Sequence, residues 1–203
     1  MNKWIMAGTA AAFTGAAAFA RSEYERIHLD IVHYDIKTDK LGLEWNGFKA
    51  VFLSDLHDNS FGMENEELLA AIEKEQPDIV VIGGDMLVVK EWAAPHFDML
   101  ANLYKKLVKR YPVYYAFGNH EQRMKEEPLT YPGWWQSYWK VLKDSGMHVL
   151  VNKSEEIIKN GTAMRISGIT LPRECYRKGR IPSLSAGYID KKIGKASDKN
   201  FEL

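Results

Sequence analysis

Three short apolar runs in the first part of the chain each stop at a group of polar residues. They are the runs Lys49–Leu53, Asp78–Ile82 and Val113–Phe117, and the polar groups that follow are Ser54-Asp55-Leu56-His57, Gly83-Gly84-Asp85 and Gly118-Asn119-His120-Glu121. Short apolar runs bounded by glycine and polar residues are typical of buried strands. The pattern therefore predicts three buried strands, each with polar residues at its carboxyl end.

In the segments between these runs, apolar residues recur at helical spacing. Leu68, Ala71 and Ile72 make an apolar stripe that begins after the cap candidate Asn65 and stops before Pro77. A second apolar stripe covers Phe97–Val108, and Lys and Arg residues cluster at its C-terminal end. Strand, helix and strand in succession predict parallel strand pairs, so the fold class is α/β.

An aromatic-rich segment follows the third polar group. Trp135, Tyr138, Trp139 and Leu142 recur at i, i+3, i+4 and i+7, which predicts a helix that ends near Gly146. Its aromatic face is interpreted as core packing, with a wall of an active-site mouth or a contact with lipid headgroups as alternatives.

Two further stretches read as strands. Glu155–Ile158 and Ala163–Ser167 flank Asn160-Gly161, the sequence of a type I′ hairpin, which would begin a second sheet. Imperfect alternation predicts another strand over Ile27–Lys37. The basic residues between Arg173 and Arg180 would either face an anionic substrate or lie in a solvated loop.

The polar residues at the three strand ends are candidates for a metal centre. Ligands of open α/β sheets bind at the carboxyl ends of the strands, and Asp55 and His57, two positions apart, project to the same side of an extended segment. Asp55 and Asp85 are 30 positions apart (85 − 55), and Asp85 and Asn119 are 34 apart (119 − 85). Three polar strand caps would be the simpler interpretation, but mixed oxygen and nitrogen donors repeated in this order favour a divalent cation.

Asp55-x-His57, Gly84-Asp85 and Gly118-Asn119-His120-Glu121 resemble the ordered signature of the calcineurin-like metallophosphoesterases. Within that superfamily the chain most resembles bacterial phosphoesterases with an N-terminal membrane segment, and the resemblance runs from about Ile27 to the end. It implies a layered α-β-β-α sandwich of two mixed sheets, incomplete at the C-terminus. It also implies two divalent metal ions, with Mn, Fe and Zn all fitting the ligands.

The same resemblance assigns roles to individual residues. Asp55 and His57 would bind the first metal, Asp85 would bridge the two, and Asn119 would bind the second. His120 would donate a proton or stabilise the transition state, with Glu121 orienting it. The expected reaction is hydrolysis of a phosphate monoester, diester or pyrophosphate by a metal-bridging hydroxide. The expected partner is a phosphorylated small molecule or a lipid headgroup.

The family also has a later strand-end His and a C-terminal Gly-His-x-His that this chain lacks. Only His148 follows His120, in a different context. We therefore expect the chain to be the first part of a longer protein, a natural short product being the alternative. A non-catalytic binding or scaffold module is the competing function.

Charge and cysteine content exclude other classes. The 27 Lys and Arg balance 27 Asp and Glu, which argues against a nucleic-acid partner. A single Cys175 excludes an intrachain disulfide and a cysteine-type zinc site.

The N-terminus carries an uncharged run, Trp4–Ala20, between Lys3 and Arg21. It predicts a retained membrane anchor or a signal peptide cleaved after Ala18-Phe19-Ala20, with the domain outside the cytoplasm. A buried Ala-rich helix of the domain is the alternative. The expected organisation is an apolar segment over 1–20, a first strand and linker over 21–46, and the phosphoesterase domain over 47–203. No sequence pattern points to an oligomeric state.

Overall fold

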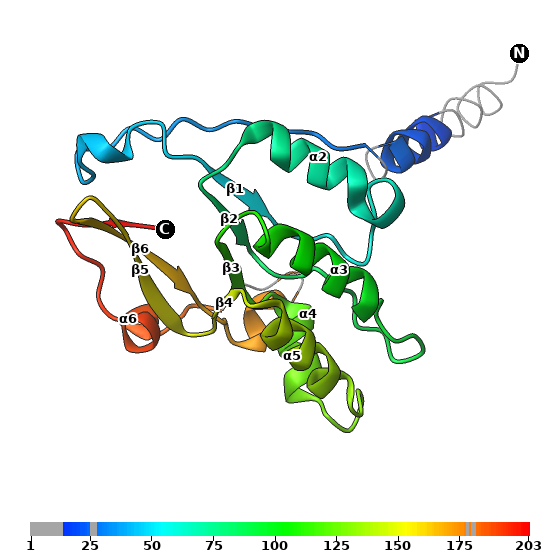
Figure 1. Cartoon of the computed structure of the whole chain (residues 1–203). Coiled ribbons are helices and arrows are strands. Elements are labelled where there is room, and N and C mark those ends of the chain that lie inside the picture. The colour runs from blue at the N-terminus through cyan, green and yellow to red at the C-terminus, as the bar shows by residue number, and fades with distance from the viewer. Residues whose placement is uncertain (1–13, 25–27, 178, 180–181) are drawn as a thin grey trace, which may run out of the picture.

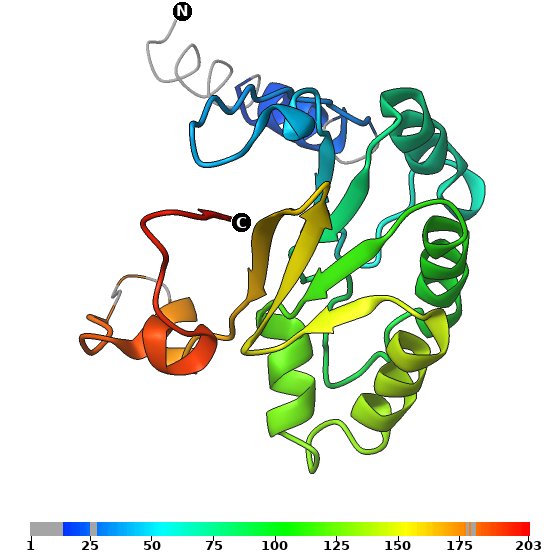
Figure 2. The same cartoon turned by 60° about the vertical axis from the view of Figure 1, so that its left-hand side comes forward.

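The computed structural model describes residues 14–24, 28–177, 179 and 182–203. These residues form four layers (Figures 1 and 2): a layer of helices, a four-stranded sheet, a three-stranded sheet and a short outer helix. The expected layered sandwich is thereby confirmed.

The four-stranded sheet contains β1 (Ala50–Leu53), β2 (Ile79–Ile82), β3 (Val113–Ala116) and β4 (His148–Leu150), in that spatial order. All three strand pairs are parallel, so among the described strands this sheet is parallel rather than mixed as expected. The connections run through α2 (Glu66–Glu75), α3 (Phe97–Val108), and the pair α4 (Asn119–Glu126) and α5 (Trp134–Ser145). The three predicted strands and the helices of the predicted stripes are all present.

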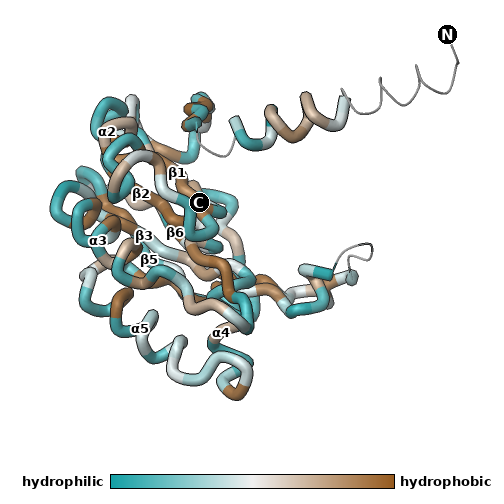
Figure 3. Tube along the Cα trace, turned by 90° about the vertical axis from the view of Figure 1, so that its right-hand side faces the viewer, coloured by the Kyte–Doolittle hydropathy of each residue, from teal (hydrophilic) through white to brown (hydrophobic). Residues whose placement is uncertain are grey.

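Side chains of β2 alternate between two cores. Val80 and Ile82 lie in the cluster shared with the helices, whereas Ile79 and Val81 lie in the cluster between the sheets. Strands covered on both faces are apolar on both faces, which explains the continuous apolar runs in the sequence. Figure 3 shows the same distribution, with hydrophobic residues along the strands and hydrophilic ones on the outer turns of the helices.

The second sheet contains β5 (Lys153–Lys159), β6 (Thr162–Gly168) and β7 (Phe201–Glu202). β5 and β6 are antiparallel, and Asn160 (φ 48°) and Gly161 (φ 88°) between them confirm the type I′ turn. β7 pairs in parallel with β6, so this sheet is mixed. Helix α6 (Tyr188–Ile193) covers its outer face, where Ser154 and Arg165 donate to the Ile193 carbonyl.

The strand predicted over 27–37 is wrong for residues 28–37, which contain neither helix nor strand. This segment runs extended past α2, where His33 contacts Glu75 at 3.0 Å, and most of its side chains are exposed. Alternating residues fit a strand, but no strand among the described residues pairs with this segment. Asn65 also differs from expectation: it occupies the position before α2, yet its side-chain oxygen accepts from Phe61 N rather than capping the helix.

A helix occupies residues 14–24 of the N-terminal segment, while residues 1–13 of the predicted apolar run lie outside the described residues. Within the described part of the chain, no helix combines the length and apolar character needed to cross a membrane. Membrane attachment through residues 1–20 therefore stays a prediction.

Candidate metal centre

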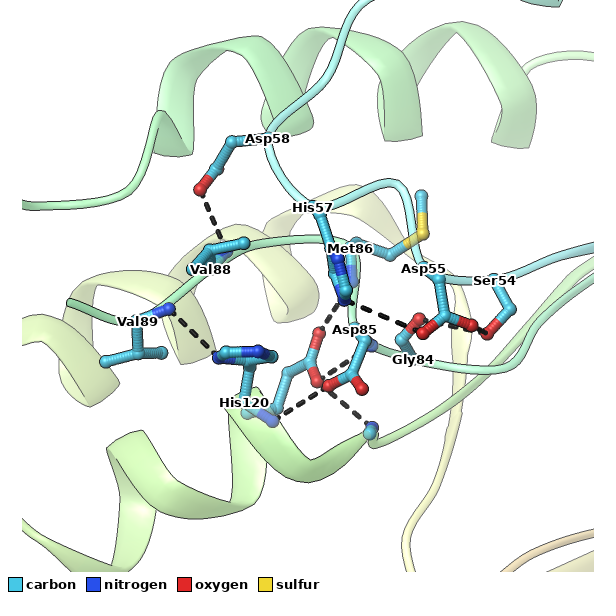
Figure 4. A network of polar contacts seen from close by, with 12 residues as sticks. Ser54, Asp55, His57, Asp58, Gly84, Asp85, Met86, Val88, Val89 and His120 are labelled. Atoms are coloured by element: carbon cyan, nitrogen blue, oxygen red, sulfur yellow. Dashed lines mark hydrogen bonds and ion pairs between the residues drawn. The ribbon is translucent and has the colours of Figure 1, made fainter. Parts of the chain in front are cut away.

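The loops after β1 and β2 lie side by side at the carboxyl edge of the parallel sheet (Figure 4). Successive amides of the first loop donate to carbonyls of the second: Asp55 N to Gly84 O, His57 N to Asp85 O and Asp58 N to Met86 O, each at 3.1 Å. This ladder fixes the two acidic loops relative to each other. The placement at the strand ends that the sequence predicted is thus held in part by backbone hydrogen bonds between the two loops.

Glycine is required where the second and third loops meet. Gly84 has φ 92°, and a Cβ there would lie 1.9 Å from Gly118 N. A Cβ on Gly118 would in turn lie 2.3 Å from Asp85 Oδ1. The two backbones therefore touch, which brings Asn119 and His120 next to Asp85.

Replacing Gly84 by Ala is expected to separate these loops. The new methyl group overlaps backbone atoms and the positive φ disfavours any Cβ, so we expect a loss of stability of about 2 kcal/mol or more. Thermal unfolding of the metal-free chain measures it. Gly161→Ala is a suitable comparison because its φ is also positive (88°) but a Cβ there meets nothing within 4 Å. Equal losses of stability in Gly84→Ala and Gly161→Ala would contradict the close contact between Gly84 and Gly118.

Asp55, His57 and Asp85 gather their donor atoms within 4.8 Å of one another. His57 Nε2 lies 3.6 Å from Asp55 Oδ1. All three residues adopt left-handed backbone conformations, with φ of 56°, 52° and 52°, which cost non-glycine residues on the order of 1 kcal/mol each. The structure tolerates this strain at the positions where the donors converge, as expected of a preorganised ligand set.

Asn119 brings a fourth donor to the same point. With the amide oriented to satisfy both of its polar atoms, its nitrogen donates to Asp85 Oδ2 at 2.9 Å and its oxygen accepts from His120 N at 3.2 Å. The Asn119 amide oxygen could serve as a neutral ligand, and together with two carboxylates and an imidazole it makes a donor set suited to Mn, Fe or Zn.

His120 lies at the start of α4 with its ring half-buried. Its backbone N–H donates to Asp85 Oδ1 at 2.8 Å, and its ring Nδ1 accepts from Val89 N at 3.1 Å. The neutral ring therefore carries its proton on Nε2. Burial lowers the pKa of His120, and the Asp85 carboxylate opposes this shift. The ring lies against that of His57, with centroids 5.4 Å apart.

The role expected for Glu121 is wrong. Its carboxylate does not hydrogen-bond to the His120 ring but accepts from three backbone amides and the Tyr115 hydroxyl. Val89 N, on the loop after β2, fixes the His120 tautomer instead. Burial raises the pKa of Glu121, and the hydrogen bond from Tyr115 works against that shift.

Two residues beside the ligands escaped the sequence interpretation. Ser54 Oγ donates to Asp55 Oδ2 at 2.6 Å. Asp58 Oδ2 accepts from Val88 N at 2.8 Å. This hydrogen bond joins the loop after β1 to the loop after β2, next to Val89, whose N–H contacts the His120 ring. The proximity of Asp58 to His57 in sequence was the available signal, but its hydrogen-bonding partner is 30 residues away.

The histidine that follows His120 in the sequence, His148, and the basic loop lie in other contacts. His148, at the start of β4, bonds Glu155 through Nδ1 at 2.7 Å. Arg173 forms an ion pair with Glu127, just after α4. Among the His, Cys, Asp and Glu side chains that the structure describes, Asp55, His57 and Asp85 form the one group close enough to hold a metal ion.

A pocket of about 630 Å³ opens beside Asp55 and His57. It is lined on one side by residues 28–30 and on the other by the loop after β1, with apolar walls from Phe52, Phe61 and Met86. The cluster of candidate ligands thus borders a cavity of the size that small molecules occupy.

Comparison with known proteins gives two matches. The family model described as calcineurin-like phosphoesterase matches residues 48–192. A Bacillus subtilis (strain 168) protein named "Uncharacterized metallophosphoesterase YkoQ" is 32% identical over 117 residues, which are 58% of this chain and 41% of that protein. The chain thus spans less than half the length of this relative.

Proposed function

Since the chain belongs to the calcineurin-like phosphoesterase family, we propose that it hydrolyses a phosphate ester with divalent metal ions held by Asp55, His57, Asp85 and Asn119. The observation that carries this proposal is the convergence of three donors within 4.8 Å of one another, with the Asn119 amide in contact with Asp85. We propose two ions, with Asp85 between them.

Divalent ions bound there would polarise the phosphoryl oxygens and lower the pKa of coordinated water. Asp55 and Asp85 supply negative charge to hold them, whereas Asn119 binds through a neutral oxygen. His120 holds a proton on Nε2 because Val89 N occupies Nδ1. Because the ring is neutral, its Nε2–H would donate a hydrogen bond to the leaving oxygen of the ester and stabilise the charge that develops there.

The pocket beside Asp55 and His57 supports a substrate with an organic group attached to the phosphate. Its polar rim and its apolar walls from Phe52 and Phe61 suit a phosphorylated small molecule or a lipid headgroup. We propose that this group occupies the pocket while the phosphate lies at the ligand cluster. Membrane attachment through residues 1–20 belongs to the same proposal, and partition of the chain between membrane and soluble fractions tests it.

Metal removal tests the proposed reaction. We expect the chain to hydrolyse p-nitrophenyl phosphate or bis-p-nitrophenyl phosphate with Mn²⁺, to lose this activity in EDTA, and to regain it when Mn²⁺ is restored. Activity that persists in EDTA would contradict the role of the metal. Metal binding without hydrolysis of any mono- or diester would favour the binding-module function instead.

A further inference from the structure

The carboxylate of Glu121 is buried and is held by four uncharged hydrogen-bond donors. Oε2 accepts from Asp85 N and Gly118 N, each at 3.0 Å, and Oε1 accepts from Met86 N at 3.1 Å and from the Tyr115 hydroxyl at 2.8 Å. Its side chain is 0% exposed. A carboxylate has about four acceptor sites, so this one is fully used, and no Lys or Arg is among its hydrogen-bond partners in the described chain.

Three buried tyrosine hydroxyls continue from this carboxylate. Tyr115 and Tyr138 are 2.6 Å apart at their hydroxyl oxygens, and Tyr138 and Tyr104 are 2.8 Å apart. The Tyr115 hydroxyl donates its hydrogen bond to Glu121, so its oxygen accepts a hydrogen bond from Tyr138. The Tyr138 hydroxyl is then already a donor to Tyr115, so its oxygen accepts a hydrogen bond from Tyr104. All three hydroxyl dipoles therefore point toward Glu121, a direction that strengthens hydrogen bonds along a chain.

This network joins the helical layer to the candidate metal ligands. Tyr104 lies on α3, Tyr138 on α5 and Tyr115 on β3, and Glu121 carries the connection to two consecutive amides at Asp85 and Met86. The Asp85 backbone has φ 52° and needs external support to stay there. A cation held by the Asp85 carboxylate would also place positive charge beside the buried Glu121 anion.

We propose that Glu121 and the chain Tyr115–Tyr138–Tyr104 are positioning residues that set the affinity of the site for divalent metal by holding the Asp85 backbone. This inference rests on the proposed function only in that the metal binds through Asp85. Partners that orient a ligand without touching the metal typically change metal affinity or activity 10- to 100-fold when lost.

Two variants test the network, one at its carboxylate and one within its chain of tyrosines. Glu121→Gln replaces an acceptor by an NH₂ group that faces backbone donors, and Tyr138→Phe keeps the ring but breaks the hydroxyl chain. We expect the Kd for Mn²⁺ to rise about 10- to 100-fold in Glu121→Gln, and by less in Tyr138→Phe. Leu142→Val, one turn further along α5 and equally buried, removes core packing without touching the network and should leave the Kd unchanged.

Amide hydrogen exchange in the metal-free chain provides a second readout. The Asp85 and Met86 amides should exchange faster in Glu121→Gln and Tyr138→Phe than in the wild type and in Leu142→Val. If Glu121→Gln does not fold, Tyr138→Phe and Tyr104→Phe carry the test.

The outcomes separate the network from the reaction. Wild-type Mn²⁺ affinity and amide exchange in the tyrosine variants, or equal changes in Leu142→Val, would overturn the positioning role even if the chain hydrolyses esters. A wild-type chain that binds Mn²⁺ but hydrolyses nothing would overturn the proposed function, while altered affinity in the variants would still support the network.

Discussion

Replacing Asp85 by Asn is expected to lower the affinity for Mn²⁺ by about 100-fold or more, because loss of a direct ligand should exceed the 10- to 100-fold effect of losing a residue that only supports one. Asn suits this position better than Ala, since Asn tolerates the left-handed backbone found there (φ 52°). It can also keep the hydrogen bond from His120 N. Isothermal titration with Mn²⁺ measures the change, and ester hydrolysis should be lost with the metal.

The matched control is Asp58→Asn. This change removes one negative charge from the same loop and keeps a side-chain oxygen for Val88 N. If metal affinity reflects only the local charge, Asp58→Asn and Asp85→Asn will weaken binding equally. If Asp85 is a ligand, only Asp85→Asn will have the large effect. Full metal occupancy in Asp85→Asn would contradict the bridging role.

Replacing His120 by Asn is expected to reduce turnover by about 100-fold or more while metal stays bound, since loss of one hydrogen-bond donor to a developing negative charge typically costs about 10²- to 10³-fold. The Asn oxygen can take the place of ring Nδ1 as acceptor for Val89 N. The Nε2–H donor, by contrast, has no replacement. His120→Ala removes both groups, so a comparison of the two variants separates loop support from the hydrogen bond to the leaving oxygen.

The leaving group provides the control for this variant. An alkoxide leaving group concentrates negative charge on its oxygen, whereas p-nitrophenolate spreads that charge over its ring. We therefore expect the loss in His120→Asn to be large for alkyl esters and much smaller for p-nitrophenyl esters. Equal losses for both substrates, or unchanged turnover for alkyl esters, would rule out stabilisation of the leaving oxygen by His120.

The ligand positions could be predicted because each depends on local sequence. An apolar run marks a buried strand, and the polar residues after it must lie at the strand's end. Asp55, His57, Asp85 and Asn119 all follow this pattern, with a glycine directly before Asp85 and Asn119, and the structure brings them together. Their assignment as ligands stays a prediction until a metal is observed.

The supporting contacts could not be predicted because they join distant parts of the chain. Glu121 follows His120 directly, which favoured a contact between them, but its carboxylate bonds Asp85 N, 36 positions away. The helix α4 was also missed, since its sequence Asn119–Glu126 is almost entirely polar and shows no apolar stripe. Residues 28–37 were wrongly predicted for the opposite reason: they alternate like a strand but pair with no strand in the described part of the chain.

Crystals of the chain grown with Mn²⁺ give the most direct test of the account. An anomalous difference map should show a peak within coordination distance of the Asp55 and Asp85 carboxylates, the His57 ring and the Asn119 amide oxygen. A second peak beside Asp85 would establish the two-metal form. A map from saturating Mn²⁺ that shows no peak at these four side chains would contradict the account.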